Sequence, residues 1–266
     1  MENRSAPIVL LTDFGCKDPF VGMMKGVIAG IAPGSAVIDL THDIRPQDVF
    51  QGAFALYRSA SYFPKGTVFC AVVDPGVGTN RNAVAIQTQN FTFVGPDNGL
   101  LWPAAAADGI FDTVTLNHHG YFLDTISNTF HGRDLFAPVA AHIHLGVDPV
   151  LMGTPLNRPV VLDIPTPEPA GDALILTVLD EDRFGNLTLN ITPASFNTHC
   201  KSDFFLEIGG ICITDVYDTY GDAPDNTPFL LGGSSGYMEI AVKNGSAALN
   251  LEASIMDRLR LQRGSV

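Results

Sequence analysis

The segment DPGVGTNR, residues 74–81, joins a carboxylate to a guanidinium across a glycine-containing loop. Asp74 directly follows the apolar run VFCAVV, and Arg81 comes seven residues later. The two glycines allow the loop backbone to approach a ligand closely. The alternative is a structural Asp–Arg pair that braces a turn, which leaves the two glycines without a reason. We therefore expect this loop to take part in chemistry.

A second cluster, FHGRD at residues 130–134, places a histidine beside an arginine and an aspartate. A single histidine is usually structural, yet His131 shares this short segment with two charged side chains and a glycine, just ahead of a predicted helix. The pattern favours a chemical role for His131. Arg133 and Asp134 are interpreted as residues that cap and brace the helix.

Two further aspartates follow predicted strands, Asp13 after IVLLT and Asp97 after FTFVG. Ligands of open α/β sheets bind beyond the carboxyl ends of the strands, where such side chains converge. An aspartate in this position is also an ordinary turn former or helix cap. We favour the turn role for Asp97, and both roles stay open for Asp13.

The segment DRFGN, residues 182–186, is a third cluster, in the second half of the chain. A hairpin turn explains Gly185, and Asp182 and Asn186 are common turn residues, so a structural role competes evenly with a binding role. The segment GGSSGY, residues 232–237, taken alone predicts only a glycine turn.

Hydrophobic periodicity predicts the elements that position these residues. Short β-branched runs alternate with segments of helical period up to about residue 163, which is typical of an α/β domain with a central, mainly parallel sheet. The predicted strands are 8–12, 36–40, 67–73, 82–88 and 91–95. The predicted helices begin at the cap pair Asp18-Pro19, at Pro46 and near Asp134. Apolar residues recur at helical spacing in the first two. They are Val21, Met24, Ile28 and Ile31 in the first helix and Val49, Ala53, Leu56 and Ala60 in the second.

The chain changes character around residues 164–172, which are rich in proline and poor in apolar periodicity, as linkers between domains are. Residues 173–266 then follow as short alternating runs with glycine-rich or polar turns and no convincing helix. They predict a C-terminal all-β barrel domain. The expected organisation is therefore a domain at 1–163, a linker at 164–172 and a second domain at 173–266.

The composition limits the partners. A formal net charge of -13 and a pI near 4.7 argue against nucleic acid and anionic membranes, which reward clustered lysine and arginine. The four cysteines form no CxxC pair, and the N-terminal segment lacks a signal-peptide pattern. No apolar stretch is long enough to span a membrane. We expect a cytoplasmic protein with a neutral or cationic small-molecule partner.

Common fingerprints are absent from the sequence. It contains no GxxxxGK[ST], GxSxG or HExxH, and DPGVGTNR lacks the third glycine of GxGxxG. A metal hydrolase that uses Asp13, Asp18, Asp74 and His131 is disfavoured, because close-spaced ligand pairs are missing. We expect neither a metal nor another cofactor.

Six motifs together resemble the SAM hydrolase (SAM hydroxide adenosyltransferase) family, where SAM is S-adenosyl-L-methionine. They occur in the family's order over nearly the whole chain: TDFG (12–15), DPGVGT (74–79) with Arg81, PDNGLL (96–101), TFHGRDLFAP (129–138), DRFGN (182–186) and SSGYMEIAV (234–242). The resemblance implies an N-terminal α/β domain, a C-terminal β-barrel and a homotrimer. In that trimer the active sites lie between one subunit's first domain and its neighbour's second.

The resemblance also implies roles for individual residues. The family's Asp, Arg and His triad falls on Asp74, Arg81 and His131. The ribose-binding carboxylate falls on Asp13, and Phe14 and Asp18 of the same segment join the substrate-binding set.

The remaining implied contacts fall mainly in the second half of the chain. The methionine end of the substrate meets Asp182, Asn186 and Ser234, while Tyr220 stacks on adenine, with Phe184 and Phe130 as further walls. The related fluorinating enzyme holds the methionine carboxylate with an arginine. This sequence has Ser235 there, so a hydroxyl or backbone amide takes that part.

The same comparison predicts the nucleophile. Halogenating relatives do not carry the triad Asp, and the fluorinating enzyme has a long insertion before PDNGLL, where this chain has only QTQNFTFVG. A carboxylate beside the attacking position repels a halide but accepts a hydrogen bond from water. The expected reaction is hydrolysis of SAM to adenosine and L-methionine, by in-line attack of an oriented water on ribose C5′. A SAM-dependent halogenase and a non-catalytic SAM or adenosine sensor are the alternatives.

Overall fold

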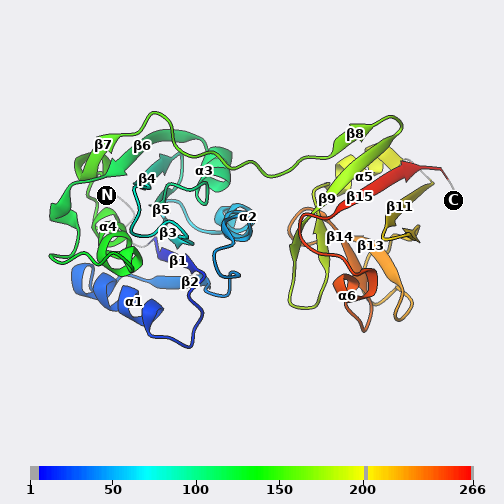
Figure 1. The fold of residues 1–266 in the computed structure, drawn as a ribbon, viewed down its shortest axis with the longest axis horizontal. Helices are drawn as coiled ribbons and strands as arrows, with labels where there is room; N and C mark the ends of the chain where they lie inside the picture. Colours follow the sequence, from blue (N-terminus) through cyan, green and yellow to red (C-terminus); the bar gives the residue numbers. More distant parts are fainter. Residues whose placement is uncertain (1–5, 201–202, 265–266) are drawn as a thin grey trace. The chain divides into compact units, whose positions relative to one another are not determined.

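A computed structural model describes residues 6–200 and 203–264 of the chain. The chain divides into two compact units, Met1–Asp163 and Ile164–Val266, and each has its own sheet and core (Figure 1).

The first unit is built on a mixed seven-stranded sheet. Neighbouring strands β2, β1, β3 and β5 pair in parallel, whereas β4, β6 and β7 are antiparallel to their neighbours. The predicted α/β class is confirmed, but the parallel pairing is confined to half of the sheet. Strands β4 and β5 are joined by three residues, too few for the crossover that a parallel pair needs. The strand order is β2 (Val37–Thr41), β1 (Ile8–Thr12), β3 (Val68–Val72), β5 (Thr92–Pro96), β4 (Ala83–Thr88), β6 (Ile110–Leu116) and β7 (Gly153–Pro155).

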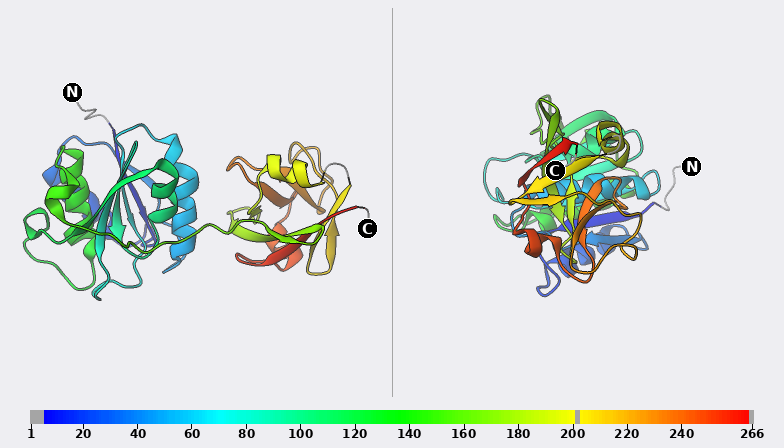
Figure 2. Two further views of the ribbon diagram at one scale, coloured as in Figure 1. Left: turned by 90° about the horizontal axis from the view of Figure 1, so that it is seen from above. Right: turned by 90° about the vertical axis from the view of Figure 1, so that its right-hand side faces the viewer.

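Helices cover both faces of this sheet. Helices α1 (Phe20–Ile31) and α4 (Ala137–His144) pack together on one face, and α2 (Val49–Ser59) and α3 (Trp102–Asp108) on the other (Figure 2, left). Two predicted helix starts are wrong. Asp48 rather than Pro46 precedes α2 and caps it by accepting a hydrogen bond from Gln51 N, while α1 has Pro19 at its cap position and no side-chain cap.

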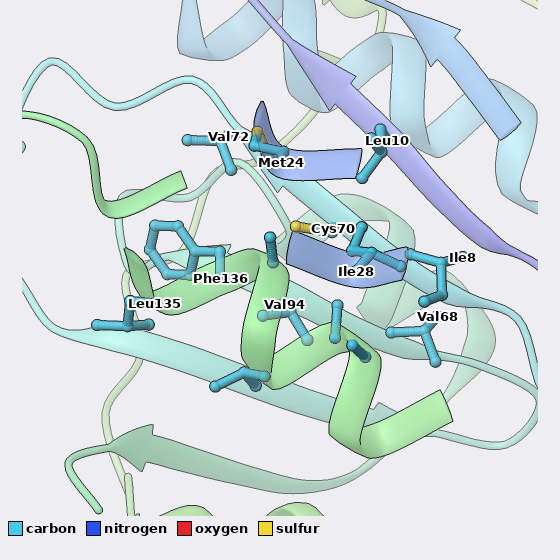
Figure 3. Packing of buried hydrophobic residues seen from close by; sticks show 14 of the residues in the cluster. Ile8, Leu10, Met24, Ile28, Val68, Cys70, Val72, Val94, Leu135 and Phe136 are labelled. Atoms are coloured by element: carbon cyan, nitrogen blue, oxygen red, sulfur yellow. The ribbon is translucent and has the colours of Figure 1, made fainter. Parts of the chain in front are cut away.

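The core explains why the central strands are continuously apolar. Successive side chains of a strand point to opposite faces, so a strand covered on both faces is buried throughout. Ile8 and Leu10 of β1 face α1 and α4, while Val9 and Leu11 face α2 and α3. Strand β3 alternates in the same way. Figure 3 shows the α1 and α4 side, where Met24 and Ile28 of α1 lie over these strands.

The second unit is an antiparallel, barrel-like sheet, as predicted, but it also contains two helices that the sequence analysis missed. The order is β12 (Ile211–Ile213), β11 (Phe204–Ile208), β15 (Arg258–Arg263), β9 (Ala173–Glu181), β10 (Leu187–Leu189), β14 (Met238–Val242) and β13 (Pro228–Gly232). Helix α5 (Pro193–Cys200) buries Phe196 and Cys200, four residues apart. Helix α6 (Ala247–Leu251) begins at Ser246, whose side chain accepts from Leu249 N.

Part of the predicted linker is regular structure. Strand β8 (Glu168–Ala170) pairs with the start of β9 through a two-residue turn, Gly171-Asp172, in which Gly171 has φ +64°. Gly-Asp is a recognised hairpin signal, so this strand was detectable from the sequence.

The cysteines Cys16, Cys70, Cys200 and Cys212 are free thiols. Burial raises the pKa of Cys70 to about 12, and burial also raises the pKa of Cys200, to about 11, against the opposing charge of Arg263. Within residues 6–200 and 203–264, we find no helix with the length and apolarity that a membrane crossing requires.

Candidate active site

Parallel strands β1, β3 and β5 are neighbours in the sheet, so the residues that follow them share one edge. Asp13, Asp74 and Asp97 occupy these positions. The structure gives the three carboxylates different partners, which separates their roles.

Asp74 is clamped by Arg81. Arg81 Nε lies 3.0 Å from both oxygens of Asp74, and Nη2 lies 2.5 Å from Oδ2. The side chains of Asp74 and Arg81 are 5% and 11% exposed, so this ion pair is largely withdrawn from solvent. Planar, multiply bonded Arg–carboxylate pairs are strong and fixed in orientation. Asp74 therefore presents an ionised, immobile carboxylate.

His131 joins this pair through the same guanidinium. Arg81 Nη2 also lies 2.8 Å from His131 Nδ1. A guanidinium has donors and no acceptor, so Nδ1 accepts this hydrogen bond and must be unprotonated. The ring proton of neutral His131 is therefore on Nε2. Asp74, Arg81 and His131 therefore form one hydrogen-bonded cluster.

The electrostatic surroundings keep His131 neutral. Burial and then the positive charge of Arg81 lower the pKa of His131, and the charges of Asp74 and Asp134 and a hydrogen bond with the Ser127 backbone oppose them only in part. The pKa lies below the ordinary histidine value of about 6.5. At neutral pH the ring is uncharged, in agreement with its acceptor role toward Arg81.

The glycines of the 74–81 loop have a structural explanation that the sequence analysis lacked. Gly78 has φ +75°, and a Cβ there would lie 2.3 Å from the carbonyl oxygen of Asn128. A Cβ on Gly76 would lie 3.2 Å from Cγ of Arg81. These glycines let the loop pack against its own arginine and against the segment that leads to His131. The expectation that both glycines also let the backbone approach a ligand stays a prediction.

His131 is held at the start of a widened helical turn. Residues Gly132–Phe136 form a π-helical turn that continues into α4, an uncommon geometry frequent at functional sites. Asp134 is fully buried and accepts hydrogen bonds from Ser127 N and Arg133 Nε. Burial raises the pKa of Asp134, but the bonds from Arg133 and Ser127 lower it below its ordinary value. Arg133 and Asp134 brace this turn, as predicted, but neither caps a helix.

Asp13 and the aromatic residues lie in the loop after β1 and beside His131. Asp13 Oδ2 accepts a 2.8 Å hydrogen bond from Gln47 N, so this carboxylate is fixed. The rings of Phe14, Phe20 and Phe130 meet edge to face, with centroids 5.1–5.9 Å apart. Phe20, which no sequence motif singles out, completes the cluster and is 40% exposed.

The other two loop aspartates of the first unit have simpler surroundings. Asp97 accepts hydrogen bonds from Val160 N and Asn82 Nδ2, which agrees with the structural role favoured from sequence. Asp18 is exposed and forms no cap for α1.

In the second unit, the DRFGN segment is a tight turn organised by its own aspartate. Asp182 Oδ1 accepts from the backbone N–H groups of Phe184 and Asn186, and Oδ2 accepts from Asn186 Nδ2. Phe184 at the tip is 76% exposed. Asp182 and Asn186 therefore make the hydrogen bonds of a turn, as the structural interpretation predicts. Their binding role stays a prediction.

Tyr220 lies beside two carboxylates, one of which the sequence analysis missed. Its hydroxyl donates to Glu239 Oε2 at 3.2 Å, and its ring meets Phe229 edge to face. Burial and the nearby charges of Glu239 and Asp182 raise the pKa of Tyr220 to about 12. Glu239 sits in the alternating strand YMEIAV, where the sequence gives no sign that it turns toward Tyr220.

The serines of the GGSSGY turn differ. Ser234 is exposed, whereas Ser235 Oγ is buried without a hydrogen-bond partner among the described residues. The turn is closed by Gly233 N, which donates to Tyr237 O. The predicted binding residues thus fall into two groups, one in each unit.

The whole chain matches one family. A model described as the SAM hydroxide adenosyltransferase N-terminal domain matches residues 8–153, and one described as the C-terminal domain of the same family matches residues 176–260. The chain belongs to the SAM hydroxide adenosyltransferase family. The resemblance inferred from the six motifs is thereby confirmed.

Relatives of the chain have named functions. The chain is 38% identical to an (R)-S-adenosyl-L-methionine hydrolase of Thermus thermophilus, over 95% of this chain and 99% of that protein. A fluorinase of Actinoplanes is 24% identical over 90% of this chain and 91% of the fluorinase. The crystal structure of an uncharacterized conserved protein from Thermotoga maritima is similar, with a TM-score of 0.90 and 35% sequence identity. The match covers 96% of this chain and 100% of the Thermotoga chain.

Proposed function

We propose that this protein hydrolyses SAM to adenosine and L-methionine, with water as the nucleophile at ribose C5′. The observation that carries the proposal is that Asp74 and His131 both contact one guanidinium nitrogen, Arg81 Nη2. Family membership and hydrolases 37–39% identical over nearly the whole chain support the same reaction.

The reaction moves a positive charge. The water oxygen forms a bond to C5′ as the C5′–S bond breaks, and the bond's electron pair leaves with sulfur to give neutral methionine. The positive charge passes from sulfur to the attacking oxygen, which then loses a proton. Asp74, placed beside the water, stabilises charge as it develops there, and an interaction that strengthens in the transition state accelerates the step.

The two side chains contribute in different ways. Among the described residues, Asp74 Oδ1 accepts only the bond from Arg81 Nε, whereas Oδ2 accepts two bonds, so Oδ1 keeps room to accept a hydrogen bond from water. His131 accepts from Arg81 through Nδ1 and so holds the guanidinium that fixes Asp74. In this tautomer His131 does not remove the proton of water, and the proton leaves to solvent after attack.

Halide is the alternative nucleophile, since fluorinases are distant relatives. An anion beside the ionised carboxylate of Asp74 is repelled, whereas a water molecule is attracted. The clamp therefore favours hydrolysis over halogenation. A non-catalytic SAM or adenosine sensor would bind the same molecules but has no need for a carboxylate fixed beside the reacting carbon.

Further properties belong to the same proposal. We infer a homotrimer in which neighbouring subunits supply the first-unit and second-unit residues, no added metal or other cofactor, a cytoplasmic location, and preference for the (R) sulfonium epimer named for the relatives. Asp13 is assigned to the ribose hydroxyls, Phe14 and Asp18 join the substrate-binding set, and Phe130 is assigned as a wall of the adenine site. The second-unit residues take adenine and methionine: Asp182, Phe184, Asn186, Tyr220, Ser234 and Ser235.

The test is product identification. Purified protein is incubated with SAM in halide-free buffer and in chloride buffer, and the adenosyl product is identified by chromatography and mass. Adenosine in both buffers supports the proposal. A 5′-chloro product in chloride buffer makes the protein a halogenase, and unchanged SAM with tight binding makes it a sensor.

A further inference from the structure

A chain of polar side chains runs from the protein surface to the end of β1. Thr12, the last residue of β1, is fully buried, and its Oγ1 lies 2.8 Å from Nδ1 of His42, which is 4% exposed. His42 Nε2 lies 3.1 Å from Asp39 Oδ1 without a well-aligned hydrogen bond. Asp39 Oδ2 in turn accepts a 2.6 Å hydrogen bond from Lys25 Nζ.

The Thr12 hydroxyl also contacts the loop that follows β1. Phe14 N donates to Thr12 Oγ1 at 3.2 Å, so the hydroxyl joins His42 to the backbone of the 12–15 loop. Burial raises the pKa of Asp39, but the hydrogen bond from Lys25 and the nearby His42 ring lower it below its ordinary value, so the carboxylate is ionised.

A register shift brings the members of the chain together. In the pairing of β1 with β2, Leu10 is opposite Asp39 but Leu11 is opposite Thr41, so one residue of β2 is left out of register. In a regular strand, residues three apart point to opposite faces. The irregularity breaks this alternation and allows Asp39 and His42 to approach each other.

The segment that begins at His42 holds the 12–15 loop at several points. Gly15 N donates to the carbonyl oxygen of His42 at 2.8 Å, and Gln47 N donates to Asp13 Oδ2 at 2.8 Å. Together with the bond from Phe14 N to Thr12 Oγ1, these contacts fix both the backbone of the loop and the carboxylate of Asp13. Nothing in the chemistry proposed above requires His42.

We propose that Thr12 and His42 are positioning residues, which act through the 12–15 loop to present the Asp13 carboxylate to the ribose hydroxyls. The inference rests on the proposed function for the identity of the ribose ligand. Loss of the Thr12 hydroxyl leaves both His42 Nδ1 and Phe14 N without their partner, so it loosens the loop that these bonds hold. The effect is on substrate geometry and not on the reacting atoms.

The variants isolate the hydroxyl of Thr12. Thr12→Val keeps the shape and removes the bonds to His42 and Phe14, and Thr12→Ser keeps the hydroxyl. Thr67→Val is the matched control, because Thr67 is also fully buried and its hydroxyl also bonds within its loop, to Pro64 O at 2.7 Å. We expect kcat/KM for SAM to fall about tenfold or more in Thr12→Val. Thr12→Ser restores most of it, and Thr67→Val leaves it within about twofold.

A second substrate separates positioning from general destabilisation. A SAM analogue whose ribose lacks the 2′- and 3′-hydroxyls cannot use Asp13. With this analogue, we expect Thr12→Val to lower kcat/KM only about twofold, because coupled groups lose their interaction when either is removed. Asp39→Ala, at an exposed position, tests the same chain if Thr12→Val does not fold, with a smaller loss in the same direction.

Binding of adenosine and of 2′,3′-dideoxyadenosine gives a readout that does not need turnover. If the wild-type protein fails to hydrolyse SAM but Thr12→Val weakens adenosine binding and spares the dideoxy compound, the proposed function fails and the positioning role stands. The positioning role is overturned if the folded variants have wild-type kcat/KM and wild-type affinity for adenosine. It is equally overturned if Thr12→Val weakens the binding of adenosine and of the dideoxy compound by the same factor. It is also overturned if the wild-type protein binds adenosine no better than the dideoxy compound.

Discussion

Arg81 Nη2 lies 2.8 Å from His131 Nδ1, and because a guanidinium can only donate, this contact fixes the histidine as an acceptor. It also places a permanent positive charge beside the ring. Both consequences favour neutral His131 with its proton on Nε2. Together with the clamp on Asp74, they produce a site that fixes a water molecule rather than one that removes its proton early.

Replacement of Asp74 by Asn keeps the shape of the side chain but removes its charge. We expect kcat to fall by about 10²- to 10³-fold, because the charge that develops on the attacking water loses its nearest counter-charge. The dissociation constant for SAM should change only about fivefold or less, since the interaction is made mainly in the transition state. Single-turnover kinetics and calorimetry measure the two quantities. Near-normal turnover contradicts the role of Asp74.

The lowered pKa of His131 predicts the acidic limit of activity. Protonation removes the acceptor for Arg81 and sets two positive charges side by side, so activity requires the neutral ring. Since burial and Arg81 lower the pKa, while Asp74 and Asp134 oppose them, activity is kept as pH falls to about 6.5 and is lost only below it. The pH profile of kcat/KM measures this acidic loss of activity. A loss whose midpoint lies above the ordinary histidine pKa contradicts the assignment, and His131→Asn should abolish the dependence on pH in this range.

Gly78→Ala tests the packing of the 74–81 loop. The added Cβ meets the carbonyl oxygen of Asn128 at 2.3 Å in a left-handed backbone conformation. We expect a loss of about 2–3 kcal/mol in the free energy of unfolding, measured by denaturant titration. The control is Gly34→Ala, where φ is +83° and no atom lies within 4 Å, so only the conformational cost of about 1 kcal/mol remains. Equal losses in the two variants contradict the close approach.

Tyr220 tests the adenine assignment. If its ring stacks on the base, Tyr220→Phe keeps KM for SAM within about twofold, while Tyr220→Ala raises it about tenfold, the usual cost of losing one stacked base. Tyr62→Ala is the control, because Tyr62 is 78% exposed and lies on the stretch that leads into the amino end of β3. An unchanged KM in Tyr220→Ala removes this residue from the binding surface.

The sequence predicted those parts of the fold that depend on local pattern. Ile8–Leu11 is an apolar run that Thr12 ends, and the predicted bounds 8–12 match β1. Helix α3 was missed because WPAAAAD is short and shows little periodicity, and α5 and α6 were missed because each is eight residues or fewer. The antiparallel half of the first sheet depends on how strands pair, which periodicity alone does not contain.

The candidate site was likewise predictable only in the parts that depend on local sequence motifs. The motif positions of Asp74, Arg81 and His131 predicted a cluster, and the structure places the three in contact. The partners of these residues were not predictable in this way. His42 contacts Thr12 across thirty positions of chain, and Glu239 contacts Tyr220 across nineteen.

The origin of the oxygen on C5′ tests the central claim most directly. SAM is converted in water enriched in ¹⁸O, without halide, and the adenosine formed is analysed by mass spectrometry with fragmentation that locates the label. We predict one labelled oxygen per adenosine, at the 5′ position. Unlabelled adenosine, or label at any other position, contradicts attack of water on C5′.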